Sequence, residues 1–167
     1  MISIPDQEQN ESSTSQKILA LAALYEGAFS VDWLQEIWGG KASQILNVLD
    51  LGVKKRWISQ SAPDRFRFTD SKIRLDLLTT MSDSKKEEIR QQAVEIMLKD
   101  LPVSEDEFQT ATTMLLHVNN NLQGCQFLYK KGNQYRKIYQ YEKALQCFKK
   151  VIKDLEVLKG DAAELLL

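Results

Sequence analysis

The stretch Leu128–Asp154 restricts the fold of this chain more than any other part of its sequence. Apolar residues recur there at helical spacing on both sides of a short break near Tyr139, which predicts two helices joined by a turn. Gly132 and Ala144 stand where the helices would touch, because small residues let two backbones approach closely. The stretch contains no catalytic grouping, so it predicts part of a helical array that binds or transmits.

Length and composition predict a globular protein. The 167 residues fit one large domain or two small ones, and 43% of them are apolar, which is enough for a core. No apolar run approaches the roughly 18 residues of a membrane helix, and the N-terminus lacks the pattern of a signal peptide. Cys125 and Cys147 are too few for a disulfide framework or a zinc site. We therefore expect a reduced, cytoplasmic protein without membrane contact, metal or other cofactor.

Charged residues alternate in sign along the chain, although the formal net charge is only −1. Residues 1–40 carry a net charge of −5, residues 41–74 of +5, residues 75–120 of −5 and residues 121–167 of +4. Blocks of opposite sign attract each other, so we expect either docking between them or an acidic partner for the basic ones.

The N-terminal part is predicted to begin with three helices. Residues 1–13 are polar and acidic, and we expect them to form a disordered lead-in. From Thr14 the spacing of apolar residues predicts a helix that ends at Gly27. Ser30 is a cap for a short second helix, and a third helix is expected over residues 41–54.

A β-hairpin is predicted directly after these helices. Residues 57–60 and 65–68 alternate in polarity and are rich in aromatic side chains, with a turn at Pro63-Asp64 between them. Three helices followed by a hairpin is the order of a winged helix, in which the hairpin is the wing. We assign residues 14–82 to this domain.

Further helices are predicted down to the C-terminus. Asp70 or Thr69 caps the first of them, and capping boxes of Ser84 with Glu87 and of Ser104 with Glu107 open the next two. The expected helices cover about residues 71–81, 84–99, 104–118, 122–137 and 141–158.

Breaks between these helices divide the second half of the chain. Pro102 separates the paired helices of residues 83–121, which we interpret as a linking helical hairpin. Residues 122–167 form the hairpin that contains Leu128–Asp154. Gly160 is expected to end its last helix, so that Asp161–Leu167 would begin a further, truncated helix.

The C-terminal hairpin resembles a tetratricopeptide repeat, a unit of about 34 residues made of two paired helices. Four residues fall in the register of the repeat, and Leu128 takes the place of its large first-helix residue; the four are Gly132, Tyr135, Ala144 and Phe148. The sequence departs from the pattern at Lys131, where leucine is usual, at Tyr139, where glycine is usual, and at Val151, where alanine is common. A single repeat is not a stable solenoid, so the resemblance implies neighbouring hairpins.

The N-terminal part resembles the winged-helix segment that follows the nucleotide-binding core of STAND-class signalling ATPases. Bacterial multidomain regulators of the LuxR and sigma-54-activator kinds carry this segment. The resemblance rests on Leu21–Phe29, Ser30–Trp38, Lys55–Ile58 and Phe66–Phe68, the last leading into a helix with Arg74. Asp70 stands where that family usually has histidine. The resemblance implies an upstream nucleotide-binding core and further repeats downstream.

One face of the predicted repeat is a candidate for binding a protein or peptide. The first-helix positions that line a tetratricopeptide groove fall on Gln126, Tyr129, Asn133, Arg136 and Lys137. A tyrosine, an amide and two cations suit an acidic peptide, because charge-assisted hydrogen bonds would hold its carboxylates. The same positions are equally consistent with a solvated helix face.

The predicted winged helix offers a second candidate surface, for DNA. The exposed stripe of the third helix carries Lys41, Gln44, Asn47 and Lys54, and the wing carries Arg65 and Arg67. Amides pair with adenine edges, and basic groups hold phosphates. Asp50 interrupts the stripe, and the chain as a whole is not basic, so we treat DNA binding as the alternative.

No residues predict an enzyme. Gly39-Gly40-Lys41 lacks the earlier glycine and the following Ser or Thr of a phosphate-binding loop. His117 is the only histidine, and no cysteine or carboxylate constellation accompanies it. We therefore expect a mainly α protein, with a winged helix followed by tetratricopeptide-type hairpins, that mediates protein–protein or interdomain contacts in a bacterial regulator. The uncovered outer side of the repeat makes a homodimer a further expectation.

Overall fold

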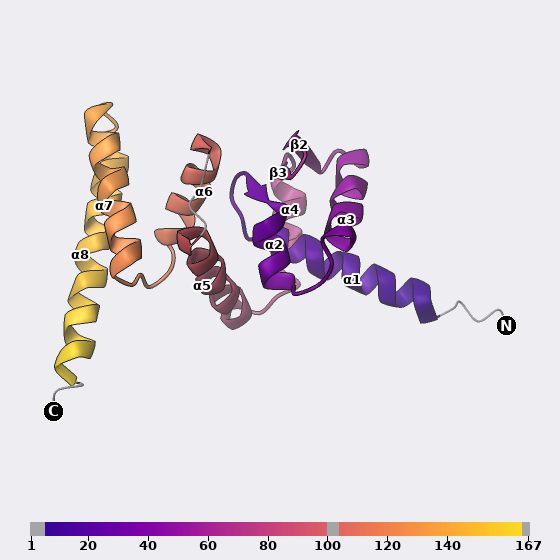
Figure 1. The fold of residues 1–167 in the computed structure, drawn as a ribbon, viewed down its shortest axis with the longest axis horizontal. Coiled ribbons are helices and arrows are strands. Elements are labelled where there is room, and N and C mark those ends of the chain that lie inside the picture. The colour runs from indigo at the N-terminus through magenta and orange to yellow at the C-terminus, as the bar shows by residue number, and fades with distance from the viewer. Residues whose placement is uncertain (1–5, 100–103, 165–167) are drawn as a thin grey trace.

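The computed structural model describes residues 6–99 and 104–164, which form eight helices and three strands (Figure 1). The expected mainly helical chain with one small antiparallel sheet is confirmed. The elements of the N-terminal unit are α1 (Asp6–Ala22), β1 (Phe29–Ser30), α2 (Val31–Trp38), α3 (Ala42–Lys54), β2 (Ile58–Ala62), β3 (Arg65–Phe68) and α4 (Ser71–Leu78). They are followed by α5 (Asp83–Lys99), α6 (Glu105–Leu115), α7 (Leu122–Lys137) and α8 (Tyr141–Glu164). None of the described helices is both long and apolar enough to span a membrane.

Side-chain caps set the starts of three helices where the sequence places them. The Ser30 hydroxyl accepts a hydrogen bond from the Trp33 amide at the start of α2, at 3.2 Å. Asp70 Oδ1 accepts from the amides of Lys72 and Ile73 at the start of α4. The expected capping box of Ser104 and Glu107 is present at α6. Each cap satisfies amides that have no partner inside the helix.

The sheet has one more strand than the sequence predicts. β1 pairs antiparallel with β3, and β3 pairs with β2, which gives the order β1-β3-β2. Phe29 lies opposite Phe66, and both side chains are fully buried. β1 consists of two residues only, and its pairing partner is distant in sequence, so no alternation in the sequence marks it as a strand.

Several expected boundaries are wrong. α1 ends at Ala22, five residues before the expected end at Gly27. α1 begins at Asp6, so helix replaces the expected disorder over 6–13, while residues 1–5 lie outside the described chain, as does Pro102. α5 begins at Asp83, and Ser82 rather than Ser84 accepts the hydrogen bond from the Lys85 amide.

Another wrong boundary is near the C-terminal end of α8. α8 continues through Gly160 to Glu164, so no further helix begins at Asp161. One glycine costs only about 1 kcal/mol in a helix interior, which is too little to end a helix of 24 residues.

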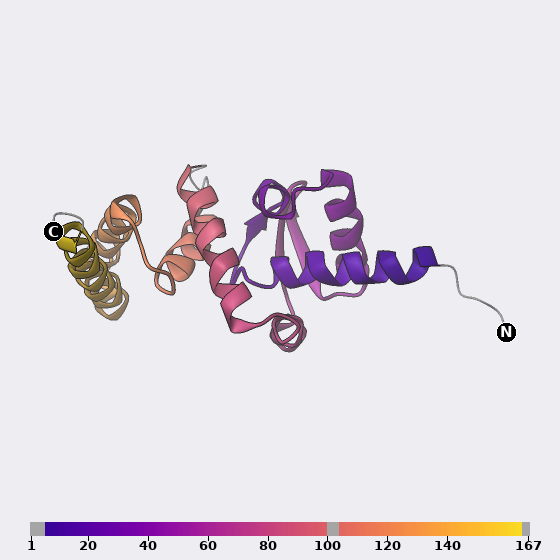
Figure 2. The ribbon, with the colours of Figure 1, turned by 90° about the horizontal axis from the view of Figure 1, so that it is seen from below.

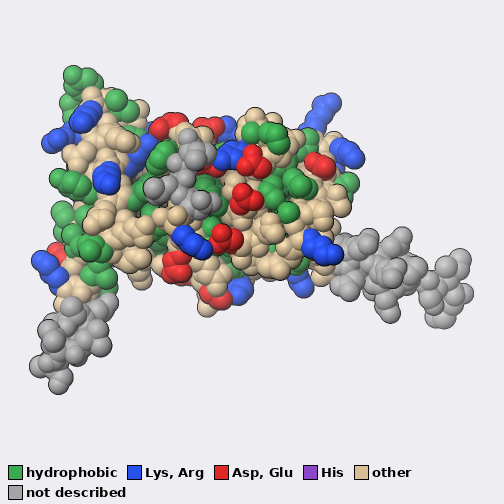
Figure 3. Space-filling view, viewed as in Figure 1, with side chains coloured by type: hydrophobic (Ala, Val, Ile, Leu, Met, Phe, Trp, Pro, Cys, Tyr) green, Lys and Arg blue, Asp and Glu red, His purple; other side chains and the backbone are tan. Residues whose placement is uncertain are grey.

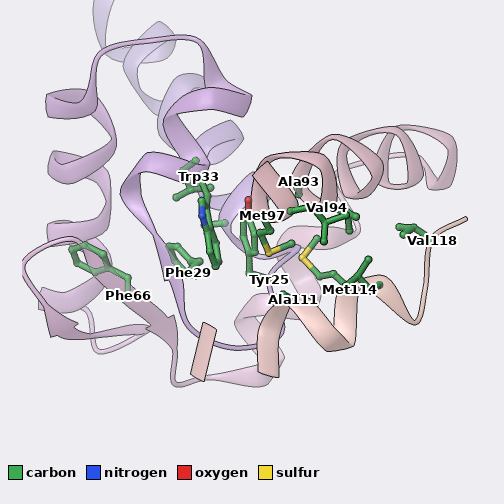
Figure 4. Close-up of a cluster of buried hydrophobic side chains, with 14 of the residues drawn as sticks. Tyr25, Phe29, Trp33, Phe66, Ala93, Val94, Met97, Ala111, Met114 and Val118 are labelled. Carbon is green, nitrogen blue, oxygen red and sulfur yellow. The ribbon is translucent and has the colours of Figure 1, made fainter. Parts of the chain in front are cut away.

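A continuous core joins the N-terminal unit to α5 and α6. Tyr25 stacks on Phe29 and Trp33, with ring centroids 5.5 and 5.9 Å away. Figure 4 shows Met97 of α5 beside Tyr25, and Met114 of α6 beyond Met97, on the side away from Phe29 and Trp33. The views in Figures 1 and 2 place α5 and α6 between the N-terminal unit and the α7–α8 pair. The linking helices are therefore part of one packed body.

α7 and α8 pack side by side as an antiparallel pair (Figure 1). A Cβ atom built on Gly132 would lie 2.7 Å from Cε1 of Phe148, so the missing side chain permits the close approach. Leu128, Tyr135 and Ala144 are buried between the helices. Tyr139 occupies the turn with a φ of +62°, a conformation that favours glycine.

Candidate interaction surfaces

The two arginines of the β2–β3 hairpin face acidic residues at the start of α6. Arg65 Nε lies 2.7 Å from Glu107 Oε1, and its guanidinium also pairs with Asp64. Arg67 lies 3.9 Å from Asp106, with both side chains at least half exposed. Ion pairs with α6 therefore engage the two arginines that the DNA alternative assigns to phosphates.

Glu107 takes part both in the capping box of α6 and in the ion pair with Arg65. Its Oε2 accepts a hydrogen bond from the Ser104 amide and completes the capping box, while Oε1 faces Arg65. The side chain is only 1% exposed, and a buried carboxylate requires such partners because burial removes its hydration. The residue that caps α6 thereby also ties α6 to the sheet.

The α3 face contains the other residues of the DNA alternative. Lys41, Gln44, Asn47 and Lys54 are all exposed, as the alternative requires. Leu51 falls at helical spacing between Asn47 and Lys54, and half of its surface is exposed. Leucine has no donor for a phosphate oxygen, so this position adds no hydrogen bond to the contact that the DNA alternative needs.

The predicted peptide face on α7 is only partly open. Gln126, Tyr129, Arg136 and Lys137 are exposed, and Asn133 is half-buried. The Asn133 amide donates a hydrogen bond to the carbonyl of Tyr129, one turn earlier. The Tyr129 ring lies over Phe148 of α8, with centroids 5.9 Å apart. The structure thus places the five residues along one helix without closing them into a pocket.

An apolar stripe lies uncovered on α8. Tyr141, Leu145 and Ile152 recur at the spacing of one helix face, and each is more than half exposed. Phe148 and Leu155 fall on the same face and are half-buried. Apolar side chains are visible along the α7–α8 pair in Figure 3. We call these residues of α8 the α8 stripe. Its Phe148 packs on α7, whereas its three exposed residues leave an apolar side of the hairpin partly uncovered, as the sequence predicts.

Lys131, which stands where a tetratricopeptide repeat usually has leucine, is a residue of α7 that is buried against α6. Its side chain is 6% exposed, and Nζ lies 2.7 Å from Glu105 Oε1. The ammonium also lies over the rings of Phe108 and Tyr135, at 5.8 and 5.3 Å from their centroids. The lysine stem fills the apolar space of the usual leucine, and its head reaches the partly solvated carboxylate.

Polar side chains also join the α6–α7 loop to α8. The Asn120 amide donates to the Leu115 carbonyl at 2.8 Å and to Asp154 Oδ2 at 2.6 Å. Lys150 Nζ lies 2.6 Å from the other oxygen of Asp154. Asn120 and Asp154 are both buried, so this network fixes how α8 is placed against the preceding hairpin.

A groove of about 640 Å³ lies between α6 and α8. Thr112, Leu116, Tyr135 and Cys147 form its inner surface. Its other lining residues are polar or basic: Gln109, Thr113, His117, Lys143, Gln146, Lys149, Lys150 and Lys153. Sequence reasoning did not identify this groove. The available signal was the basic excess of residues 121–167, which did not show that several lysines face α6.

The described histidine, cysteine and acidic side chains are the residues that a metal site or a reactive thiol would require. Among the residues described, no three histidine, cysteine or acidic side chains gather as a metal site. Both cysteines are buried, and burial raises the pKa of each thiol, so neither is an activated nucleophile. Gly39 ends α2 with a φ of +73°, which accounts for the glycines before Lys41.

Comparison of the chain with protein-family models, with curated proteins and with solved structures found no match.

Proposed function

We propose that this chain is a non-catalytic regulatory segment that relays signals through protein–protein or interdomain contacts in a bacterial regulator of the STAND class. In this proposal residues 14–82 are a winged helix, residues 83–121 a linking pair and the α7–α8 pair a tetratricopeptide-like repeat. The observation that carries the proposal is the pairing of Arg65 with Glu107, because it turns the wing toward the chain's own helices.

The arrangement of elements supports both parts of this assignment. The N-terminal unit has the order helix, strand, two helices, two strands and a final helix, with a three-stranded antiparallel sheet. In the C-terminal pair, Gly132 contacts Phe148, as the register of a tetratricopeptide repeat requires. The buried Lys131 keeps the packing role of the leucine that it replaces.

The proposed mechanism is a rigid-body relay. The core that includes Tyr25, Met97 and Met114 joins the N-terminal unit to the linking helices, and Asn120 with Asp154 joins those helices to α8. Packed interfaces of this kind move as units rather than deforming continuously. A partner bound at α7–α8 would therefore shift how the winged helix packs on a nucleotide-binding core.

The α8 stripe is where we place the next repeat of an array or, in the isolated chain, a second copy. Tyr141, Leu145 and Ile152 form a face of the kind that stacked repeats bury against each other. Gln126, Tyr129, Asn133, Arg136 and Lys137 remain the proposed peptide-contacting residues on α7.

Unfolding tests the relay, because all three tryptophans lie in the N-terminal unit, at positions 33, 38 and 57. Their fluorescence reports this unit alone, whereas far-ultraviolet circular dichroism reports every helix. The two urea transitions should coincide if the chain is one cooperative body. Transitions that separate in the unmodified protein would contradict a rigid relay.

The DNA alternative is tested by titrating a labelled duplex at low salt. Binding of nucleic acid through phosphate contacts falls steeply as salt rises. We expect no binding at 50 mM salt by fluorescence anisotropy. Tight binding with a steep salt slope, lost on Lys41→Ala and Lys54→Ala substitution, would establish the DNA alternative instead.

A further inference from the structure

The α6–α8 groove is separate from the α7 face that the proposed function uses. None of the five predicted peptide-contacting residues lines it. Its walls come from α6 and α8, and Tyr135 of α7 contributes to its base. The Tyr135 hydroxyl donates a hydrogen bond to Gln109 Oε1 at 2.6 Å, which fixes the base to the α6 wall.

The charges in the groove are unbalanced. Lys143, Lys149, Lys150 and Lys153 line it, together with His117, and no aspartate or glutamate does. Only Lys150 has an acidic partner, the buried Asp154. Among the described side chains, none that is acidic lies within ion-pair distance of Lys143, Lys149 or Lys153.

Lys143 is held at one end of the groove. Its ammonium lies 5.5 Å from the centroid of the Tyr135 ring. Lys153 lies ten positions further along α8, which corresponds to about 15 Å at a rise of 1.5 Å per residue. Lys149 falls between them, so three cations without acidic partners mark out the length of the groove.

We propose that the α6–α8 groove binds an extended acidic peptide, with its carboxylates on Lys143, Lys149 and Lys153 and one apolar side chain against Leu116 and Tyr135. In an extended chain, alternate residues point the same way and repeat about every 6.6 Å. Three carboxylates at alternate positions therefore span about 13 Å, which is within reach of a row of lysines whose ends are separated by about 15 Å along α8.

A peptide fits this groove better than a nucleic acid does. Leu116 and Tyr135 provide a short apolar base, and no arginine lines the groove to hold a phosphate with two parallel hydrogen bonds. The proposal does not depend on the regulatory function proposed above, because it uses only residues of the groove.

The test is a nuclear magnetic resonance titration of the full chain with a capped octapeptide that has three glutamates at alternate positions and one leucine. Amide shifts should change at Thr113, Gln146 and Cys147 and leave α3 unaffected. A matched peptide with glutamine for each glutamate should bind at least tenfold more weakly. Lys149→Glu and Lys153→Glu should each weaken binding at least fivefold, whereas Lys159→Glu, on the same helix outside the groove, should not.

Three outcomes would overturn the proposal. One is the absence of shifts in the groove at millimolar peptide, with the fold intact by circular dichroism. Another is equal binding of the glutamate and glutamine peptides. The third is tighter binding of a thymidine octanucleotide than of the acidic peptide at the same ionic strength, which would assign the groove to nucleic acid.

Discussion

Arg65 of β3 and Glu107 of α6 form an ion pair with 2.7 Å between Nε and Oε1, and Glu107 is almost fully buried. The two residues come from neighbouring charge blocks of opposite sign, +5 over residues 41–74 and −5 over residues 75–120. Lys131 and Glu105 repeat this pattern between the next two blocks. Charge alternation along the sequence therefore corresponds to docking between successive units of the fold.

We expect Arg65→Ala to lower the free energy of unfolding by about 3 kcal/mol, because it removes the guanidinium that lies 2.7 Å from the buried Glu107 carboxylate. Arg67→Ala is the matched control. Arg67 and Asp106 are exposed and 3.9 Å apart, so its loss should cost under about 1 kcal/mol. Urea unfolding followed by circular dichroism measures both. Equal losses in the two variants would show that the buried pair has no special role.

The sequence predicts features of this fold that depend on neighbouring residues. The Ser30, Asp70 and Ser104 caps were placed correctly because a cap is a contact over two or three residues. The sequence does not predict β1, because its pairing with β3 joins residues that lie far apart in the sequence. The prediction that Gly160 ends the last helix is wrong, because a continuous helix tolerates one glycine.

The candidate surfaces also divide into features that the sequence predicts and features that depend on contacts between distant residues. The exposure of α7 and the uncovered α8 stripe follow from helical spacing, which the sequence contains. Contacts between distant elements depend instead on how the helices pack in space. The sequence does not predict the pairing of Arg65 with Glu107, or the groove that α6 forms with Lys143, Lys149 and Lys153. The net charges of successive sequence blocks predict attraction between the blocks, but they do not predict which residues form the ion pairs.

Lys131 can be tested by restoring the leucine that is usual at its position in the repeat. Lys131→Leu should change the free energy of unfolding by less than about 1 kcal/mol, because apolar burial replaces a pair whose carboxylate is 80% exposed. Lys131→Ala should cost roughly 2 kcal/mol, since it removes the stem packed against Phe108 and Tyr135. Thermal or urea unfolding measures the difference. A leucine variant as unstable as the alanine one would contradict a packing role.

The buried thiols predict a dependence of stability on pH. Burial raises the pKa of Cys147, and burial together with Asp154 raises that of Cys125, so the unfolded chain ionises first as pH rises. Their contribution is fully present below the ordinary thiol pKa of about 8.5 and is lost as pH rises through the folded-state values. The free energy of unfolding should therefore fall between pH 8 and 9.5. A variant with alanine at both positions should show a smaller fall, and an equal fall would assign the effect to other groups.

Tyr139 is a non-glycine residue in the left-handed region, at a φ of +62°, in the turn between α7 and α8. Tyr139→Gly should stabilise the chain by about 0.5–1 kcal/mol, because relief of roughly 1–2 kcal/mol of backbone strain exceeds the conformational entropy cost of glycine. Ile138→Gly is the control: Ile138 has a φ of −102° and is also exposed, so glycine there should destabilise by about 0.5–1 kcal/mol. If backbone strain is the dominant effect, thermal unfolding should show a higher Tm for Tyr139→Gly and a lower Tm for Ile138→Gly. A loss of stability in both would mean that the contact of the Tyr139 ring with Tyr141, at 6.1 Å between centroids, outweighs the strain.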